Sequence, residues 1–169
     1  TLTDISIGET LQTISGPGFI EEQIHTSRYR ISPNAFFQTN PRGAKILLDT
    51  VTQYCGDLSN KTLLDLYCGS GFFSIALAEN TKKCIGVELS KEAIADARIN
   101  AQLNQRTIDY HDAKTEEFDW KSLGANVVIL DPPRSGMHDQ ALKDILLAKP
   151  KHIVYISCNY KNFAREWVQ

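Results

Sequence analysis

The spacing of hydrophobic positions changes near residue 40. Before that point no helical period appears, whereas after it short apolar runs alternate with longer stretches in which apolar residues recur every three or four positions. The short runs are typical of buried strands and the periodic stretches of helices. The expected strands are residues 62–66, 83–87, 106–110, 126–130 and 152–156. The expected helices are residues 41–54, 72–78, 91–104, 140–148 and 159–168.

Strands that are apolar along their whole length must be covered on both faces, so this alternation predicts an α/β fold with a doubly wound, mostly parallel sheet. Residues 1–39 contain instead a Gly16-Pro17-Gly18 turn pattern and a β-rich stretch from Glu21 to Ile31. We therefore expect a β-rich N-terminal segment (1–39), the remnant of a preceding module or a set of linker strands, followed by an α/β domain (40–169).

Ligands of such sheets bind beyond the carboxyl ends of the strands. Gly69 and Gly71 follow the first expected strand, where glycines let backbone N–H groups approach a ligand closely. Glu88 follows the second strand, 17 residues beyond Gly71, at a position where a carboxylate can accept hydrogen bonds from both ribose hydroxyls. Ser74 replaces the third glycine of the dinucleotide fingerprint. A cofactor that carries a nucleoside is favoured over a purely steric glycine turn with a solvated glutamate.

Three further strand ends carry polar residues. Asp112 follows the third strand, where it fits an adenine amine and an ordinary turn equally well. Asp131-Pro132-Pro133-Arg134-Ser135-Gly136 follows the fourth strand, and two prolines make this acidic loop stiff. Cys158 follows the fifth strand at the start of a helix, a position that favours the nucleophilic thiolate.

The other three cysteines, Cys55, Cys68 and Cys84, lie in a helical apolar face, in the glycine turn and inside a strand. We interpret them as small buried hydrophobic residues. No CxxC pair occurs, so neither a zinc ribbon nor a disulfide scaffold is indicated, and no metal site is expected. A reducing compartment, the cytoplasm, is the expected location.

Composition narrows the class further. The 169 residues are 42% hydrophobic, and 18 basic against 20 acidic side chains give a net charge of -2. This composition excludes disordered and collagen-like chains, and no apolar run approaches the roughly 20 residues of a membrane span. The overall charge of a nucleic-acid binder is also lacking.

Five segments together resemble the S-adenosylmethionine-dependent RNA uracil carbon-5 methyltransferases, which make 5-methyluridine in ribosomal and transfer RNA. Three of them, which contain FFQTN, DPPRSG and SCN, are far more specific than the glycine turn. The resemblance implies a Rossmann-like class I methyltransferase fold, with residues 40–169 as its S-adenosylmethionine-binding domain. The segments are YRISPNAFFQTN (29–40), LLDLYCGSGFFSIALA (63–78), IGVELSKEAIADARINAQLN (85–104), VVILDPPRSG (127–136) and YISCNYKNFARE (155–166).

The resemblance also implies roles for individual residues. Cys158 would be the catalytic nucleophile, adding to carbon 6 of a flipped-out uracil so that carbon 5 can take the methyl group. The implied residues that contact S-adenosylmethionine, or line its pocket, are Gln38, Tyr67, Gly69, Glu88 and Asp131.

In this family the base that removes the carbon-5 proton is a glutamate beyond the SCN motif, and no such segment follows here. The last sheet strands and an N-terminal RNA-binding module are likewise missing, so we expect a C-terminally incomplete catalytic domain. An RNA partner is expected, ribosomal RNA ahead of transfer RNA. A basic set near Gln38 could face RNA or simply be solvated; its members are Arg28, Arg30, Arg42 and Lys45.

Two other functions stay open at this point. A nicotinamide-dependent oxidoreductase would use the same glycine turn and Glu88. A non-catalytic fragment would bind the cofactor without turning it over.

Overall fold

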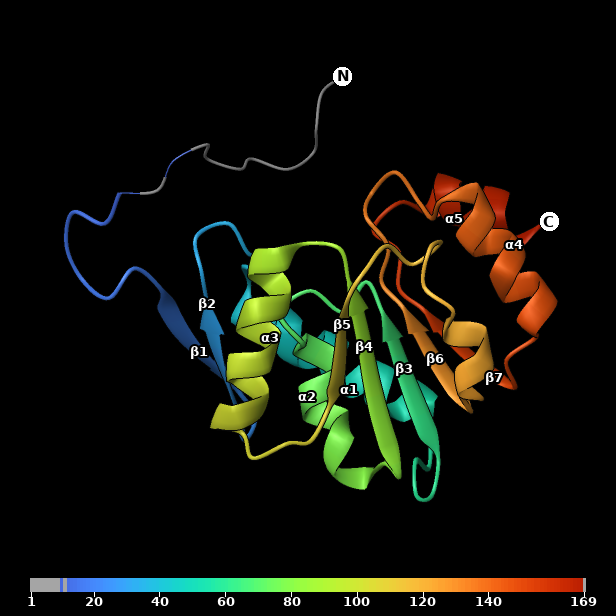
Figure 1. Ribbon diagram of the computed structural model, residues 1–169, viewed down its shortest axis with the longest axis horizontal. Helices are drawn as coiled ribbons and strands as arrows, with labels where there is room; N and C mark the ends of the chain where they lie inside the picture. Colours follow the sequence, from blue (N-terminus) through green and yellow to red (C-terminus); the bar gives the residue numbers. More distant parts are fainter. Residues whose placement is uncertain (1–9, 11, 169) are drawn as a thin grey trace.

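Five parallel strands form the central sheet of the protein (Figure 1). The computed structural model describes Thr10 and residues 12–168. The strands lie in the order β5-β4-β3-β6-β7, so that β3, the first of them in sequence, is central. Their bounds are β3 Thr62–Leu66, β4 Lys83–Glu88, β5 Asp109–Asp112, β6 Val127–Leu130 and β7 His152–Tyr155.

Helices cover both faces, which confirms the predicted doubly wound α/β fold. Alternate strand residues point to opposite sides. Leu63 packs with the α1 and α2 side, and Leu64 packs with the α4 side. The helices are α1 Pro41–Cys55, α2 Phe72–Leu77, α3 Lys91–Leu103, α4 Asp139–Ala148 and α5 Tyr160–Trp167, with short 3-10 turns at Ala78–Asn80 and Trp120–Leu123.

Local sequence chemistry accounts for several helix starts. The Asn40 side chain accepts a hydrogen bond from the Gly43 N–H (3.1 Å), and Pro41 occupies the first helical position of α1. Ser90 caps α3 in the same way through the Ala93 N–H (3.3 Å). These two helices therefore begin where the sequence predicts.

The third strand begins later than predicted. The expected range, 106–110, becomes Asp109–Asp112 because residues 105 and 106 are needed to close α3. Gln105 adopts a left-handed conformation (φ 55°), and the Arg106 N–H bonds back to the Ala101 carbonyl (2.9 Å). This is a Schellman closure in which glutamine takes the usual place of glycine.

A hairpin precedes the sheet. Strands β1 (Ile20–Ile24) and β2 (Ser27–Ile31) pair in antiparallel fashion, as the β-rich composition of residues 21–31 predicts. Residues 1–9 and 11 of the predicted N-terminal segment lie outside the described residues. The hairpin side chains Ile24, Tyr29 and Ile31 are buried in the same core as α1 and α2.

Helix α3 lies beside β2 (Figure 1). Side chains of α3 and of its C-cap bond one edge of β2 in place of another strand. Asn104 and Asn100 each accept from a β2 N–H and donate to the carbonyl of the same residue, Arg28 (2.8 and 2.6 Å) and Arg30 (2.6 and 2.9 Å) respectively. Asp96 accepts from the Ser32 N–H (2.6 Å) and hydroxyl (2.8 Å). We call these three residues the α3 ladder.

The α3 ladder works because of matched spacing. Four residues along a helix and two along a strand cover similar distances, so positions 96, 100 and 104 can face alternate residues of β2 and the residue just after it, Ser32. Asn100 is fully buried, and its Nδ2 also donates to the Ser70 carbonyl (3.1 Å) in the turn after β3. The hairpin is thereby fixed to the sheet edge where ligands bind in such folds.

No helix in the part of the chain that the structure describes is both long enough and apolar enough to cross a bilayer.

We expect Asn100→Ala to lower the free energy of unfolding by about 3 kcal/mol, because it leaves buried backbone groups of Arg30 and Ser70 unpaired. Urea denaturation followed by circular dichroism measures this loss. Gln102→Ala is the matched control, since Gln102 is exposed on the same helix and should change stability by less than about 0.5 kcal/mol. Equal losses in both variants would contradict the importance of the α3 ladder.

Candidate active site

The residues singled out from the sequence gather at the carboxyl ends of the strands. A narrow pocket there is lined by four of the five predicted cofactor residues, Gln38, Tyr67, Gly69 and Asp131. Its remaining walls are aromatic or belong to the glycine turn: Phe36, Phe37, Cys68, Ser70, Phe72 and Phe73. A chain segment that precedes the sheet, the turn after β3 and the loop after β6 therefore share one cavity.

The glycine turn is held in an unusual backbone conformation. Tyr67, Gly69 and Gly71 all have positive φ angles, of 64°, 53° and 85°. A β-carbon on Gly71 would collide with the Tyr110 hydroxyl and approach Ile75 Cδ1 to 2.8 Å, so only glycine fits there. Ser74 sits where the dinucleotide fingerprint has its third glycine, and its hydroxyl pairs with the Tyr110 hydroxyl (3.0 Å).

Packing sets the position of Gln38. The preceding Phe37 ring packs against Tyr29 and Phe72, with ring centroids 5.3 and 5.5 Å apart. The Ser70 hydroxyl donates to the Phe36 carbonyl (3.3 Å). The FFQ segment is thus fastened both to the hairpin core and to the glycine turn, which explains how a residue far from the sheet in sequence comes to line the pocket.

Glu88 lies beside the pocket without lining it. Its carboxylate accepts from the Gly69 N–H (3.0 Å) and from the Ser90 N–H (2.7 Å). It therefore bridges the glycine turn and the start of α3, and its remaining lone pairs are the ones available to hydroxyl donors.

Buried carboxyl groups lie near one another at this sheet edge. Burial raises the pKa of Asp65 to about 7, opposed by hydrogen bonds from Ser74 and reinforced by the nearby Asp131 and Glu88 carboxylates. Burial likewise raises the pKa of Asp131 to about 6. Asp65 Oδ1 is buried without a hydrogen-bond partner in the described part of the chain. Each of these groups would gain from a cation in the pocket.

The structure does not bring Asp112 into this pocket. It is the last residue of β5, it is exposed, and it does not line the cavity.

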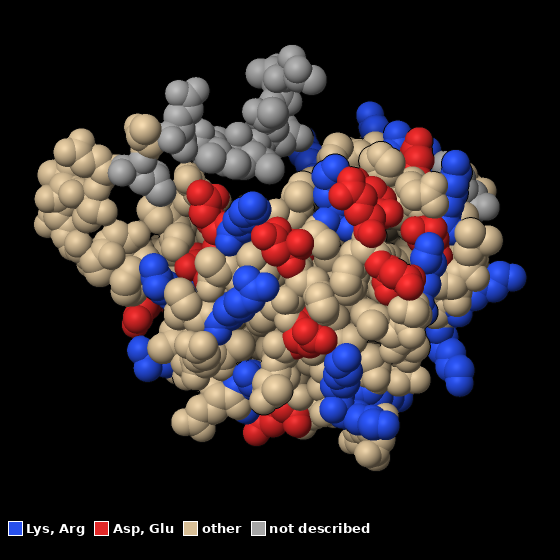
Figure 2. All heavy atoms as spheres, viewed as in Figure 1, with Lys and Arg blue, Asp and Glu red and all other residues tan. Residues whose placement is uncertain are grey.

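The basic set near Gln38 is partly engaged within the protein. Arg28 pairs with Glu21 (3.2 Å), while Arg30 lies 3.8 Å from Asp96 and stacks over Phe19, with 4.4 Å to the ring centroid. Arg42 and Lys45 are exposed on α1. On the face shown in Figure 2, basic and acidic side chains are interspersed.

Cys158 is the exposed cysteine, and Cys55, Cys68 and Cys84 are buried, as the sequence predicts. It lies between β7 and α5, just before the N-cap Asn159, whose side chain accepts from the Lys161 and Asn162 N–H groups (3.1 and 3.5 Å). Cys158 does not line the pocket but sits on the strand end next to the one that carries Asp131.

Metal ligands do not cluster within residues 10 and 12–168: no group of three or more His, Cys, Asp or Glu side chains there could hold an ion.

Burial raises the pKa of the Cys55 thiol to about 11, which keeps this thiol protonated at neutral pH.

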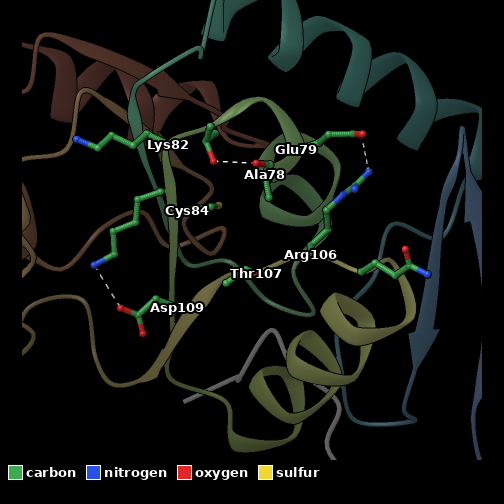
Figure 3. A pocket seen from close by; sticks show the side chains of 10 residues that line it. Ala78, Glu79, Lys82, Cys84, Arg106, Thr107 and Asp109 are labelled. Carbon is green, nitrogen blue, oxygen red and sulfur yellow. Dashed lines mark hydrogen bonds and ion pairs between the residues drawn. The ribbon is translucent and has the colours of Figure 1, made fainter.

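A larger cavity, of about 420 Å³, lies at the opposite end of the strands (Figure 3). Two of the cations that line it are paired with carboxylates, Arg106 with Glu79 (2.5 Å) and Lys83 with Asp109 (3.5 Å). None of the predicted site residues lines it. This cavity is therefore separate from the candidate active site at the carboxyl ends of the strands.

Sequence reasoning missed the polar residues that support the site. Ser70 and Asn100 are buried and link the glycine turn to the hairpin. The signal was present in α3, where Asp96, Asn100 and Asn104 recur every four residues on the side that faces the protein.

A family model described as tRNA (uracil-5-)-methyltransferase matches residues 18–118 and 109–169 of the chain. The chain belongs to this family. The resemblance noted from the FFQTN, DPPRSG and SCN motifs is thereby confirmed.

Curated relatives of the family align along nearly the whole chain. An RNA methyltransferase of Caldanaerobacter subterraneus subsp. tengcongensis is 38% identical over 166 residues, covering 97% of this chain and 37% of the relative. One from Nanoarchaeum equitans is 39% identical over 158 residues, covering 94% of this chain and 35% of the relative. The chain thus spans a little over a third of the length of these relatives.

Among solved structures, the tRNA (uracil-54, C5)-methyltransferase of Pyrococcus abyssi in complex with S-adenosyl-L-homocysteine has a TM-score of 0.85 and 36% identity. The match covers 99% of this chain and 41% of that one. The tRNA m1G37 methyltransferase of M. jannaschii has a TM-score of 0.66 at 20% identity, covering 91% of this chain and 48% of that one. This second likeness is one of fold and agrees with the predicted class I architecture.

We expect Gly71→Ala to destabilise the protein more than Gly69→Ala. Both residues have positive φ, which costs an alanine about 1 kcal/mol or more, but only the Gly71 β-carbon would also meet neighbouring atoms. The steric clash should add about 1–3 kcal/mol to the loss in free energy of unfolding, measured by urea denaturation. Similar losses in the two variants would show that the turn has room at residue 71.

Proposed function

We propose that this chain carries the cofactor site and the nucleophile of an S-adenosylmethionine-dependent RNA methyltransferase that modifies carbon 5 of a uridine. The observation that carries the proposal is the convergence at one sheet edge of the Gln38, Tyr67, Gly69 and Asp131 pocket with the exposed Cys158 on the neighbouring strand end. Family membership and the fold of the P. abyssi enzyme support it.

The pocket fits S-adenosylmethionine in the character of its residues. Asp131 in the lining supplies negative charge for a cationic ligand, and Glu88, which bonds the Gly69 N–H beside the pocket, can accept hydrogen bonds from ribose hydroxyls. The aromatic rings of Phe36 and Phe72 offer apolar contact. When bound, the cofactor supplies the methyl group as an electrophile.

Cys158 would act by covalent catalysis. Its thiolate adds to carbon 6 of the uracil, forming a C6–S bond and moving the double-bond electrons toward carbon 5 and the O4 carbonyl. Carbon 5 then takes the methyl group. Loss of the carbon-5 proton to a base returns the electrons, and the C6–S bond breaks to release Cys158. This chain's contribution is the nucleophile, and the proton acceptor is not assigned to any of its residues.

Transfer RNA is the first substrate to test, because the description of the family and that of the P. abyssi enzyme both specify it. Ribosomal RNA, expected from the sequence resemblance, is the second.

Cys158→Ala should abolish a covalent complex with RNA that contains 5-fluorouridine in the presence of S-adenosylmethionine, because fluorine cannot leave as a proton does and the adduct is trapped. Denaturing gel electrophoresis detects the complex. Cys55→Ala should still form it, since Cys55 is buried in α1 away from the strand ends. An adduct in Cys158→Ala would identify another nucleophile.

Calorimetry separates the remaining functions. Binding of S-adenosylhomocysteine without any adduct on either RNA would favour a non-catalytic cofactor-binding fragment. Binding of NAD without S-adenosylhomocysteine would overturn the proposal.

The affinity for S-adenosylmethionine should rise with pH between 5 and 8. The pKa of Asp131 lies near 6, so this carboxyl is mostly neutral at pH 5 and ionised at pH 8, and a cationic ligand binds the ionised form better. The rise should be up to about tenfold. Titration calorimetry at four pH values measures it, with Asp131→Asn as the variant in which the dependence weakens. An affinity that falls with pH would contradict this electrostatic role.

A further inference from the structure

Glu166 is a buried carboxylate of α5 that none of the predicted roles uses. Its residue is only 5% exposed, although α5 is otherwise largely solvent-facing. Burying a charged group is costly unless it is well hydrogen-bonded, so its partners indicate what it does.

The partners of Glu166 belong to two different strand ends. Oε1 accepts from the Met137 N–H (3.0 Å), directly after the loop that begins with Asp131. Oε2 accepts from the Tyr155 hydroxyl (2.5 Å), and Tyr155 is the last residue of β7. Arg165 lies 3.6 Å from Oε1 and partly balances the charge.

The backbone of the loop 131–136 lies directly against the Glu166 carboxylate. Gly136 has a φ of 91°, and a β-carbon there would overlap Glu166 Oε1, so the backbone passes directly against the carboxylate. A charged acceptor on a backbone N–H gives a stronger bond than a neutral one.

Two further bonds run along the same face of α5. The side-chain amides of Asn162 (2.7 Å) and Asn159 (3.4 Å) donate to the Arg134 carbonyl. Positions 159, 162 and 166 lie on one side of a helix, so two turns of α5 are fastened to residues 134–137. Cys158 immediately precedes the first of these contacts.

We propose that Glu166 is a positioning residue that fixes Cys158 relative to the Asp131 loop, by tying α5 to that loop and to the end of β7. This inference rests on the proposed function, in which Cys158 must reach carbon 6 of the uracil while the methyl donor lies beside Asp131. A nucleophile displaced by about 1 Å loses up to about a hundredfold in rate.

Steady-state methyl transfer to tRNA by the whole chain tests the proposal with two variants. Glu166→Ala should lower kcat by about tenfold to a hundredfold while KM for RNA and Kd for S-adenosylhomocysteine change less than about twofold. Glu166→Gln retains an oxygen for the Met137 N–H and a polar group for Tyr155, and should recover most of kcat. Glu117→Ala, an exposed acidic residue, is the matched control with unchanged kinetics.

A spectroscopic readout tests the same point without turnover. Cys158 is the exposed cysteine, so a trifluoromethyl label directed to it should give one narrow ¹⁹F resonance in the wild type and in Glu166→Gln. Broadening or splitting is expected in Glu166→Ala, with the thermal transition monitored to confirm folding.

The outcomes separate the two claims. Wild-type kcat together with an unchanged ¹⁹F spectrum in Glu166→Ala overturns the positioning role alone. Parallel loss of kcat, RNA affinity and cofactor affinity that Glu166→Gln does not rescue also overturns it, since that pattern indicates general structural damage. Failure of the wild type to form a covalent adduct with either 5-fluorouridine RNA overturns the proposed function, while the ¹⁹F spectra still decide whether Glu166 orders Cys158.

Discussion

The carboxamide of Asn100 joins segments that lie far apart in the sequence. Its oxygen and one N–H hold the backbone of Arg30, and its nitrogen also donates to the Ser70 carbonyl. Ser70 in turn holds the Phe36 carbonyl. The hairpin, the glycine turn and the FFQ wall of the pocket therefore share a single buried polar connection. In such a network each bond is worth more because leaving its partner unpaired is expensive.

The sequence predicted what depends on local chemistry. The caps Asn40 and Ser90 and the continuous apolar strands can be identified without tertiary information, and they place the glycine turn and Cys158 at strand ends. The predicted start of β5 was wrong because the left-handed residue that ends α3 is Gln105. A glycine at this position would have marked the end of the helix in the sequence, whereas a glutamine does not. Gln38 was predicted as a cofactor residue from the FFQTN motif, because the periodicity of the sequence gives no information about it.

What the sequence could not supply is the set of buried polar supports. In a helical pattern, Asn100 and Glu166 look like solvated positions, because asparagine and glutamate are mostly exposed. Their burial depends on which backbone groups of a distant segment happen to need a partner. Only the folded arrangement reveals that β2 offers an unpaired edge to α3 and that the Arg134–Met137 backbone lies against α5.

The geometry of the α3 ladder limits the length of strand that a helix can hold. Four helical residues advance about 6.0 Å and two strand residues about 6.8 Å, so the two repeats drift apart by about 0.8 Å at each step. Asn100 is at the centre of the α3 ladder, so Asp96 and Asn104 are each displaced by only one such step. All the bonds stay between 2.6 and 2.9 Å. A second step would reach about 1.6 Å, beyond what a hydrogen bond tolerates. Side chains of one helix can therefore hydrogen-bond the edge of a strand of about five residues, but not the whole edge of a longer straight strand.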